Sequence, residues 1–347
     1  MLQLGKRKGE AVVILRYPAY FEHFSCLAGA CPDSCCKEWE VLVDEDTAGR
    51  YRALPGPLGE DLRRFLRQED GDWYLTVTDG RCPMWRPDGL CRVQAELGHE
   101  ALCQTCRDFP RLTHDYGDFV ERGLELSCPE AARMIFENRD SHWICREVPG
   151  GEAPDYDPAD MEILLETRQV MVEILSDRCR PVRESLALAL LYGYHAQSLL
   201  DGGESSWDEE AALAFGKSLA RPADARELID FYKGLEILTD TWRSRLENAA
   251  GGIWDDRLRI LARYGVERYH LQAISDFDLV GRTKLVILSC LLVRALGGDF
   301  VQTAQLYAKE IENSAENVDA ILEGAYSSPA LTDDKILGLL LCEEELP

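Results

Sequence analysis

Four cysteines lie within eleven residues of this chain, in the run Cys26-Leu-Ala-Gly-Ala-Cys31-Pro-Asp-Ser-Cys35-Cys36. Five more follow before residue 130, whereas residues 129–347 hold only four of the thirteen cysteines. Regions this rich in thiols fold around disulfides or metal ions, because they seldom bury enough apolar surface to fold alone. The distribution predicts that a sulfur-rich site organises the N-terminal part of the chain.

Metal ligands are the role that we expect for these thiols. The apolar stretch near the start is interrupted by Arg16, and no small-residue cleavage site follows, so we expect no signal peptide. The best candidate for a membrane span, Leu285–Leu292, is broken by Arg294 and is far shorter than the roughly 20 residues required. We therefore expect a cytoplasmic protein, in whose reducing surroundings thiols persist.

The composition indicates a soluble globular fold, since 46% of the 347 residues are hydrophobic and 29% are charged. Residues 1–146 are expected to form a cysteine-rich, cluster-binding region, and residues 147–159, with three prolines and two glycines, a linker. Residues 160–347 are expected to be an all-helical domain. Apolar residues recur there at three- and four-residue spacing in six segments: Met161–Leu175, Val182–Leu200, Glu209–Leu219, Ala223–Ala249, Leu285–Leu296 and Val301–Ile311.

Shorter elements are expected in the cysteine-rich region. Trp39–Asp44 and Trp73–Thr78 contain the β-branched and aromatic residues typical of strands, and we expect them to pair as a short β-hairpin. Gly59–Gln68, between them, is expected to be a helix. Pro129 follows Cys128 and is expected to begin another helix, since proline suits the first helical turn. The predicted fold class is mainly α, with a metal-site region and a short β-hairpin before an all-helical domain.

The charge is strongly negative, at −24, and unevenly distributed. Residues 1–150 hold 26 acidic against 19 basic side chains, and residues 151–347 hold 36 against 19. This balance argues against a nucleic-acid partner, which basic surfaces attract. It favours a cationic partner such as a lysine-bearing protein, and it also serves solubility.

Nine cysteines are the candidate ligands of the metal site: Cys26, Cys31, Cys35, Cys36, Cys82, Cys91, Cys103, Cys106 and Cys128. Zinc takes four thiolates and an iron–sulfur cluster about four, so nine thiols exceed one site and leave one or two sites open. The side chains of the adjacent Cys35 and Cys36 are expected to diverge. A purely structural zinc site is the alternative. The isolated Cys145, Cys179, Cys290 and Cys342 are expected to be small buried hydrophobic residues outside the site.

Two known cofactor-binding patterns are absent from the sequence. The Cys-x3-Cys-x2-Cys spacing of three-ligand radical clusters is not met, because Glu38 stands three residues after Cys35. No Gly-x-Gly-x-x-Gly turn links a strand to a helix, so a Rossmann-type methyltransferase is not expected.

The cysteine blocks resemble those of the flagellin lysine-N-methylase family, also called FliB, and more loosely those of other zinc- or iron-chelating cysteine-cluster proteins. The resemblance covers about the first 135 residues and rests on blocks in this order: Tyr17-Pro18, Cys26-x4-Cys31-Pro-Asp-Ser-Cys35-Cys36-Lys-Glu-Trp39, Cys82-Pro, Gly89-Leu-Cys91, Leu102-Cys-Gln-Thr-Cys106-Arg-Asp-Phe-Pro-Arg111 and Leu126-Ser-Cys-Pro-Glu-Ala-Ala-Arg133. The helical remainder offers no such motif.

The resemblance implies a cytoplasmic enzyme that transfers methyl groups from S-adenosylmethionine to lysine side chains of flagellin or a similar protein, with a [4Fe-4S] cluster held by the cysteines. The residues alone also allow a non-enzymatic zinc-stabilised module that binds a basic protein, or a metal-carrying or redox protein. Candidate aromatic contacts for a sulfonium are Tyr17, Tyr20, Phe21, Trp39 and Trp85. Candidate bases are Asp33, His99, His114 and Glu130, and candidate carboxylate-binding residues are Arg107, Arg111 and Arg133.

Overall fold

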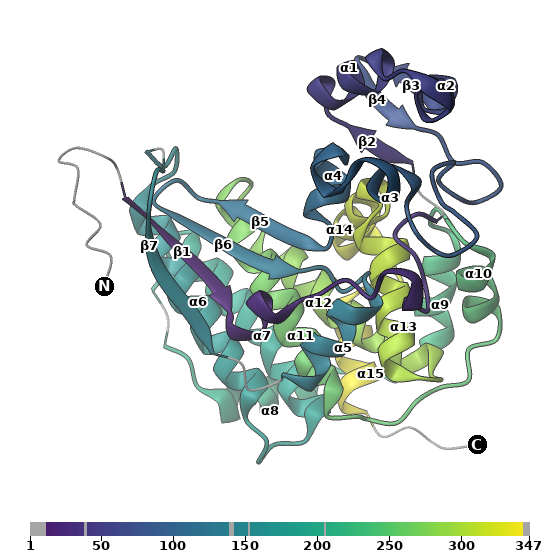
Figure 1. Ribbon diagram of the computed structural model, residues 1–347. Helices are drawn as coiled ribbons and strands as arrows, with labels where there is room; N and C mark the ends of the chain where they lie inside the picture. The colour runs from purple at the N-terminus through teal and green to yellow at the C-terminus, as the bar shows by residue number, and fades with distance from the viewer. Residues whose placement is uncertain (1–11, 38–39, 139–141, 152, 205, 343–347) are drawn as a thin grey trace.

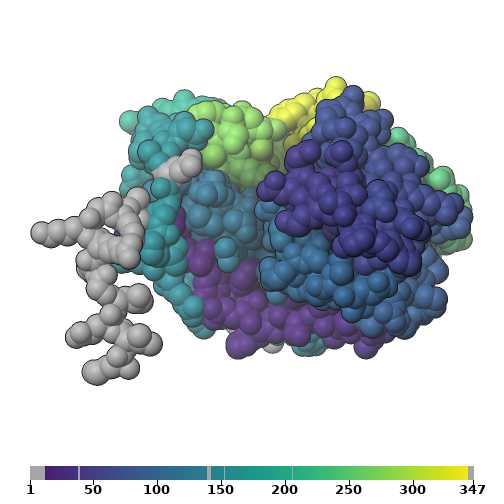
Figure 2. Space-filling model, turned by 45° about the horizontal axis from the view of Figure 1, so that its top comes forward, coloured from purple at the N-terminus to yellow at the C-terminus, as the bar shows by residue number. Residues whose placement is uncertain are grey.

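The computed structural model describes residues 12–37, 40–138, 142–151, 153–204 and 206–342. Helices dominate these residues, and two small sheets accompany them (Figure 1), which confirms the predicted mainly α class. The larger sheet and the long helices form a main body. Residues 41–108 form a small lobe, which stands above the main body in Figure 1 and projects as a mass of purple and blue atoms in Figure 2.

The sheet of the main body has four strands in the order β5-β6-β1-β7. The strands are β1 (Val12–Pro18), β5 (Arg111–Asp115), β6 (Phe119–Leu124) and β7 (Trp143–Pro149). Strand β1 pairs in parallel with part of β6. On its other side it pairs antiparallel with β7, along the whole length of β1. The sequence did not predict this sheet, because its strands come from separate parts of the chain. The small lobe is inserted between β1 and β5.

The small lobe combines a three-stranded sheet with short helices. Its sheet has the order β2-β4-β3, from β2 (Val41–Val43), β3 (Leu66–Glu69) and β4 (Asp72–Leu75). The expected pairing of the two segments is confirmed as the antiparallel pair β2 and β4, although Trp39 lies outside the described residues. The expectation that they form a hairpin is wrong, because the hairpin of this sheet joins β3 to β4. The lobe helices are α1 (Glu45–Ala53), α2 (Gly56–Phe65), α3 (Arg92–Leu97) and α4 (Gln104–Asp108).

The predicted helix Gly59–Gln68 exists as α2, but it ends at Phe65. Leu66 takes an extended backbone and begins β3, which turns back through Asp70 and Gly71 into β4. Pairing with β4 satisfies the backbone groups of Leu66–Glu69, so the sheet overrides the local helical pattern. Leu62 is fully buried and packs with Val41, Val43 and Leu75 in the core of the lobe.

The long helices of the main body largely follow the sequence prediction, and the helix expected at Pro129 is confirmed. The predicted Ala223–Ala249 is divided, because Leu238 N–H donates to Glu310 and Glu236 N–H to Asn317 instead of continuing a helix. The helices are α5 (Pro129–Glu137), α6 (Pro158–Ser176), α7 (Val182–Leu200), α8 (Glu209–Leu219), α9 (Ala225–Lys233), α10 (Asp240–Glu247), α11 (Arg257–Tyr269), α12 (Leu279–Leu296), α13 (Phe300–Tyr307), α14 (Ala315–Ser327) and α15 (Asp333–Leu341).

Helix α12 lies at the centre of the helical core and packs against α7, α11 and α14. Nearly all of its side chains are buried, including Leu288 and Cys290. A helix that is apolar all round is expected in such a position. Among the residues that the structure describes, none of the helices combines the length and the apolar character that crossing a membrane requires.

The sheet and the helical core are joined by buried charges. Both guanidinium Nη atoms of Arg168 on α6 donate to the Glu121 carboxylate on β6, each at 2.7 Å. The residues predicted as a linker run from the end of β7, at Glu147–Pro149, to the start of α6 at Pro158, where the Asp157 carboxylate caps the helix by accepting from Ala159 N–H. The sheet and the helices consequently pack against each other.

Candidate functional site

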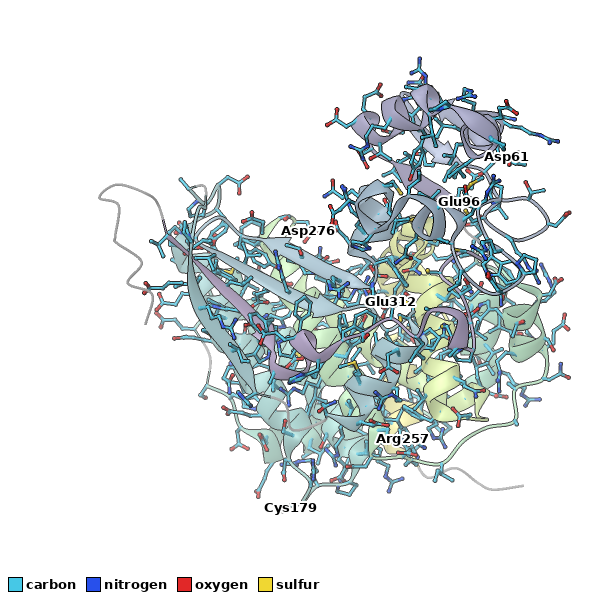
Figure 3. The ribbon with its side chains drawn as sticks, viewed as in Figure 1. Asp61, Glu96, Cys179, Arg257, Asp276 and Glu312 are labelled. Carbon is cyan, nitrogen blue, oxygen red and sulfur yellow. The ribbon has the colours of Figure 1, made fainter. Side chains whose placement is uncertain are left out.

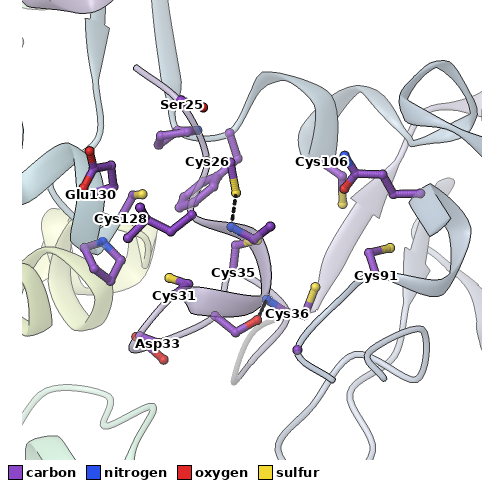
Figure 4. Close-up of a pocket in the computed structure, with 18 of the residues that line it drawn as sticks. Ser25, Cys26, Cys31, Asp33, Cys35, Cys36, Cys91, Cys106, Cys128 and Glu130 are labelled. Carbon is purple, nitrogen blue, oxygen red and sulfur yellow. Dashed lines mark hydrogen bonds between the residues drawn. The ribbon is translucent and has the colours of Figure 1, made fainter. Parts of the chain in front are cut away.

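Seven of the nine candidate cysteines line one cavity of about 350 Å³ where the small lobe meets the main body. Figure 4 shows their sulfur atoms around the Cys26–Cys36 loop. The other two, Cys82 and Cys103, are buried in the core of the lobe. The structure therefore brings together the cysteines that the sequence singled out; those that line the cavity are Cys26, Cys31, Cys35, Cys36, Cys91, Cys106 and Cys128.

Five cysteines, here called the lobe cysteines, gather on one side of the cavity: Cys36, Cys82, Cys91, Cys103 and Cys106. Their backbones are tied together, since Cys82 N–H donates to the carbonyl of Cys36 at 2.7 Å and Cys91 forms a β-bridge with Trp85. The Cys36 thiol hydrogen-bonds with those of Cys82 and Cys91, and Cys103 pairs with Cys106.

Local backbone geometry explains how the lobe cysteines are presented. Cys91 and Cys103 precede the first turns of α3 and α4 in extended conformation. Helix α4 is anchored to α1 by the Asp44 carboxylate, which accepts from Thr47 N–H and from Gln104 N–H, each at 2.9 Å. Helix starts and shared caps thus place sulfur atoms from separated segments side by side.

Hydrogen bonds between the thiols shift their acidity in opposite directions. The bond with Cys36 lowers the pKa of Cys91 to about 6, against the effect of burial, and it also lowers the pKa of Cys82. For Cys36 itself, the bond with Cys35 lowers the pKa, but the bonds with Cys82 and Cys91 and burial outweigh it, and the net pKa is raised. The group therefore favours some thiolates, the form that binds metals.

Three further cysteines, here called the loop cysteines, lie on the other side of the cavity: Cys26, Cys31 and Cys128. The backbone N–H of Ala28 donates to Cys26 Sγ at 3.3 Å, the dashed line in Figure 4. Burial raises the pKa of Cys128 to about 11 and also raises that of Cys31. Cys31 and Cys128 therefore favour the protonated thiol.

Cys35 lies between the two groups and interacts electrostatically with Cys31 and Cys91. Its thiol hydrogen-bonds with that of Cys36, so the expected divergence of these adjacent side chains is wrong. The expectation assumed a regular helix or strand, whereas these residues lie in a turn. The loop is held against the lobe because Gly29 approaches Gly89; a Cβ on Gly29 would lie 3.0 Å from the carbonyl oxygen of Asp88.

The chemistry of these side chains fits a thiolate-bound metal or cluster. All thirteen cysteines are free thiols, as predicted. Soft donors in this number suit zinc or iron–sulfur centres. In the described part of the chain, however, no three or more His, Cys, Asp or Glu side chains are arranged so that they could hold a metal ion. The thiols are hydrogen-bonded to one another, and the metal ligands remain a prediction.

The helical half of the main body contributes Lys309, which the sequence analysis missed, to the cavity wall. Lys309 Nζ lies 3.0 Å from Asp33 Oδ2. Burial raises the pKa of the Asp33 carboxyl, but the charge of Lys309 and hydrogen bonds outweigh this effect and leave its pKa below the ordinary value. Asp33 is therefore a carboxylate in an ion pair. Lys309 stands 276 residues away in sequence, where no motif marks it.

The other polar candidates divide between the cavity and elsewhere. His99, Arg107 and Arg111 line the cavity. Glu130 also lines the cavity. Exposed Arg133 donates two hydrogen bonds to its carboxylate and lowers its pKa, so Glu130 is a weaker base, and the two residues are paired with each other. His114 lies on β5 away from the cavity, and burial lowers its pKa.

The aromatic wall of the cavity consists of residues that the sequence analysis did not choose. Phe24 and Phe109 line it, and the Arg111 guanidinium stacks on the Phe24 ring at 5.1 Å. None of the four described candidates is among the lining residues: Tyr17, Tyr20, Phe21 and Trp85. The Tyr17 hydroxyl instead donates to Glu22 at 2.8 Å, and Trp85 stacks with Arg81.

The four remaining cysteines lie outside the cavity, as expected. Cys290 is fully buried in α12, which confirms its predicted role in packing. The predicted burial is wrong for Cys145 and Cys179, which are exposed, and Cys342 is half-buried. In Figure 3, Cys179 lies at the opposite end of the molecule from the lobe residues Asp61 and Glu96.

Comparison with known proteins finds relatives for about a third of the chain. This chain is 37% identical over 131 residues to the flagellar biosynthetic protein FliU of Salmonella muenchen. The match covers 36% of this chain and 78% of FliU. The identity is also 37% over 131 residues to the lysine-N-methylases of Salmonella choleraesuis and Salmonella typhimurium, but only 33% of each is covered. No family model and no solved structure matches the chain.

Proposed function

This chain belongs to the family of FliU and the lysine-N-methylases, the FliB family, and we propose that it methylates lysine side chains of a protein. The observation that carries the proposal is the cavity that seven cysteines line. Its volume of about 350 Å³ lies within the range of roughly 300–1,000 Å³ typical of small-molecule sites. A methyl donor and a lysine side chain are the proposed occupants.

The proposed cofactors are S-adenosylmethionine as methyl donor and a [4Fe-4S] cluster. The lobe cysteines would hold the cluster, because they come closest together and include the thiols of lowered pKa. Such a cluster would supply a redox-active iron centre. The loop cysteines, on the opposite wall, would remain available to the substrates or to a second metal.

The chain's own residues can prepare the lysine for reaction. A lysine ammonium with a reference pKa near 10.4 must lose a proton before its nitrogen attacks a sulfonium methyl group. The apolar side chains of Phe24, Leu27, Leu90 and Phe109 line part of the cavity, and a lysine side chain bound against them would favour its neutral amine. His99, also in the wall, is the proposed acceptor of the proton. Phe24 and Phe109 are the proposed aromatic contacts of the sulfonium cation, and on the Phe24 ring it would share the aromatic surface with the Arg111 guanidinium.

The proposed protein partner is cationic and, given the name of FliU, flagellar. Flagellin is the first candidate. The net charge of −24 would attract a lysine-rich surface and raise the rate of encounter. We propose a cytoplasmic location, where the thiols stay reduced and a newly made protein substrate is accessible.

The first test is the metal content of the full chain purified without oxygen. Iron with acid-labile sulfide and a brown colour is expected, together with transfer of labelled methyl groups from S-adenosylmethionine to lysines of flagellin from the same source. Colourless stoichiometric zinc and no transfer would contradict the proposal and favour the zinc-stabilised binding module. A Cys145→Ser variant is the control. It should match the wild type in metal content and methyl transfer, because Cys145 is exposed and lies outside the cavity.

A further inference from the structure

Two side chains of the helical half reach across to the cysteine segments. Gln305 lies on α13, and Lys309 follows in the π-helical turn η5 (Ala308–Glu312). Both contact Asp33, which stands between Cys31 and Cys35 in the loop. Figure 4 shows Asp33 at the edge of the cavity below Cys31.

Gln305 connects the two segments that carry the loop cysteines. Its Nε2 donates to Asp33 Oδ2 at 3.3 Å and to the backbone carbonyl of Ser127 at 2.7 Å. Ser127 directly precedes Cys128, the residue before the first turn of α5. Because one amide group bonds to both segments, it ties the position of Cys128 to that of Cys31.

Lys309 adds charge to the same junction. Its ammonium Nζ lies 3.0 Å from Asp33 Oδ2, and Lys37 Nζ approaches the other carboxylate oxygen of Asp33 at 3.5 Å. The Lys309 side chain is only 6% exposed, so solvent screens this pair much less than a surface pair. Displacing the loop would leave the lysine in a low-dielectric site without this carboxylate.

The π-helical turn that carries Lys309 is itself held in place from behind. The Glu310 carboxylate accepts from Leu238 N–H at 2.8 Å, and Asn317 Nδ2 donates to the Glu310 carbonyl at 2.9 Å. Single π-helical turns are often found at functional sites. Here the turn places Lys309 toward the loop while the next residue, Glu310, bonds to the helical core.

We infer that Gln305 and Lys309 are positioning residues that hold the Cys31–Cys35 segment and Cys128 at a fixed separation. The helical half thereby sets the width of the cysteine cavity. The inference deepens the proposed function and rests on it for what the cavity binds. The positioning itself concerns the free protein, so it can be tested without methyl transfer.

The test measures how fast iodoacetamide alkylates individual cysteines in the native full chain, with and without prior treatment by a chelator. Lys309→Met is expected to increase the rates at Cys31 and Cys128 by about tenfold, as loss of a buried ion pair allows local opening. Exposed Cys145 should react at the wild-type rate. Cys290, fully buried in α12, should stay protected in both proteins.

Conservative and paired variants separate positioning from general destabilisation. Lys309→Arg keeps the charge and should stay within about twofold of wild type. Asp33→Asn and Lys309→Met should each loosen the loop, and the double variant should be no looser than Asp33→Asn alone, because that substitution already removes the ion pair with Lys309. Gln305→Met should affect Cys128 most, since it removes the bond to Ser127. Lys217→Met is the matched control, as Lys217 forms an exposed pair with Glu184 at 2.9 Å.

Unchanged rates at Cys31 and Cys128 in Lys309→Met would overturn the inference. An equal rise at Cys290 would also overturn it, because the substitution would then act by unfolding the whole protein. These outcomes are independent of the proposed function. A wild-type protein that loads no cluster and methylates nothing would contradict the proposed enzyme activity, whereas the alkylation rates test the positioning role of Gln305 and Lys309.

Discussion

The small lobe and the helical half of the main body are stabilised in different ways. The helical core is large and apolar, and helix α12 at its centre is buried nearly all round. The lobe core is a small cluster into which Cys82 and Cys103 are built beside Val41, Val43 and Leu62. Small cores contribute little net stability, and bound metal often supplies the rest. We therefore expect the stability of the lobe to depend on what its thiols bind, and the stability of the helical core to be independent of it.

The largest expected effect comes from removing a lobe thiol. Cys103 is 1% exposed, and Cys103→Ser should abolish metal loading and unfold the lobe, since structural metal binding contributes on the order of 10 kcal/mol. Metal analysis and hydrogen exchange, resolved by peptide, would measure the result. The helices from α6 onward should keep their protection. If α12 lost its protection against hydrogen exchange at the same time, the two regions would fold as one unit, which would contradict their separate stabilisation.

Equivalent truncations in the two cores should give unequal losses of stability. Leu288 and Leu62 are both fully buried, the first in the helical core and the second in the lobe. Leu288→Ala should lower the free energy of unfolding by about 4 kcal/mol and Leu62→Ala by about 2 kcal/mol, because the smaller core can collapse more readily around the cavity. Denaturant unfolding would measure both. Equal losses would contradict the claim that the lobe is the more adaptable region.

The helical half should also carry a distinct sensitivity to acid. His270 is buried, with Nε2 3.0 Å from the Thr167 hydroxyl, and burial lowers its pKa to about 3 from an ordinary 6.5. Between these values the unfolded state binds more protons, so stability is fully present above pH 6.5 and is lost as the pH falls. The loss should reach about 2.5 kcal/mol near pH 4.5.

Comparing His270→Gln with wild type isolates this contribution. The variant should show a shallower fall of unfolding free energy between about pH 6.5 and 4.5. His23→Gln, which replaces an exposed histidine, is the control. Identical slopes in all three proteins would rule out a buried neutral His270.

The smallest effects are expected from exposed ion pairs, and here the two regions should not differ. Arg86 and Asp88 pair at 2.6 Å in the lobe, and Lys335 and Glu227 pair in the helical half. Arg86→Met and Lys335→Met should each change the free energy of unfolding by about 0.5 kcal/mol or less, because solvent screens such pairs. Thermal unfolding at two salt concentrations would measure these effects. A larger contribution of an ion pair would show as a loss of stability that shrinks at high salt.

Much of the helical fold and the set of cysteines could be predicted from the sequence. Helices α7 and α8 have the predicted bounds, because apolar residues recur at three- and four-residue spacing along both. The four-stranded sheet was missed, since β1 pairs with β6 across the inserted residues 41–108, and local patterns do not record so distant a pairing. The division of the predicted Ala223–Ala249 depends on Glu310 and Asn317, which lie far along the chain.

Residue type and local spacing were enough to predict nine clustered thiols, a mainly helical fold and an acidic surface. They could not predict that seven of these thiols line one cavity, or that Lys309 and Gln305 contact the loop at its edge. Contacts such as that of Lys309 with Asp33 join residues 276 positions apart. Local propensity carries no information about such pairs, because packing of the whole chain brings them together.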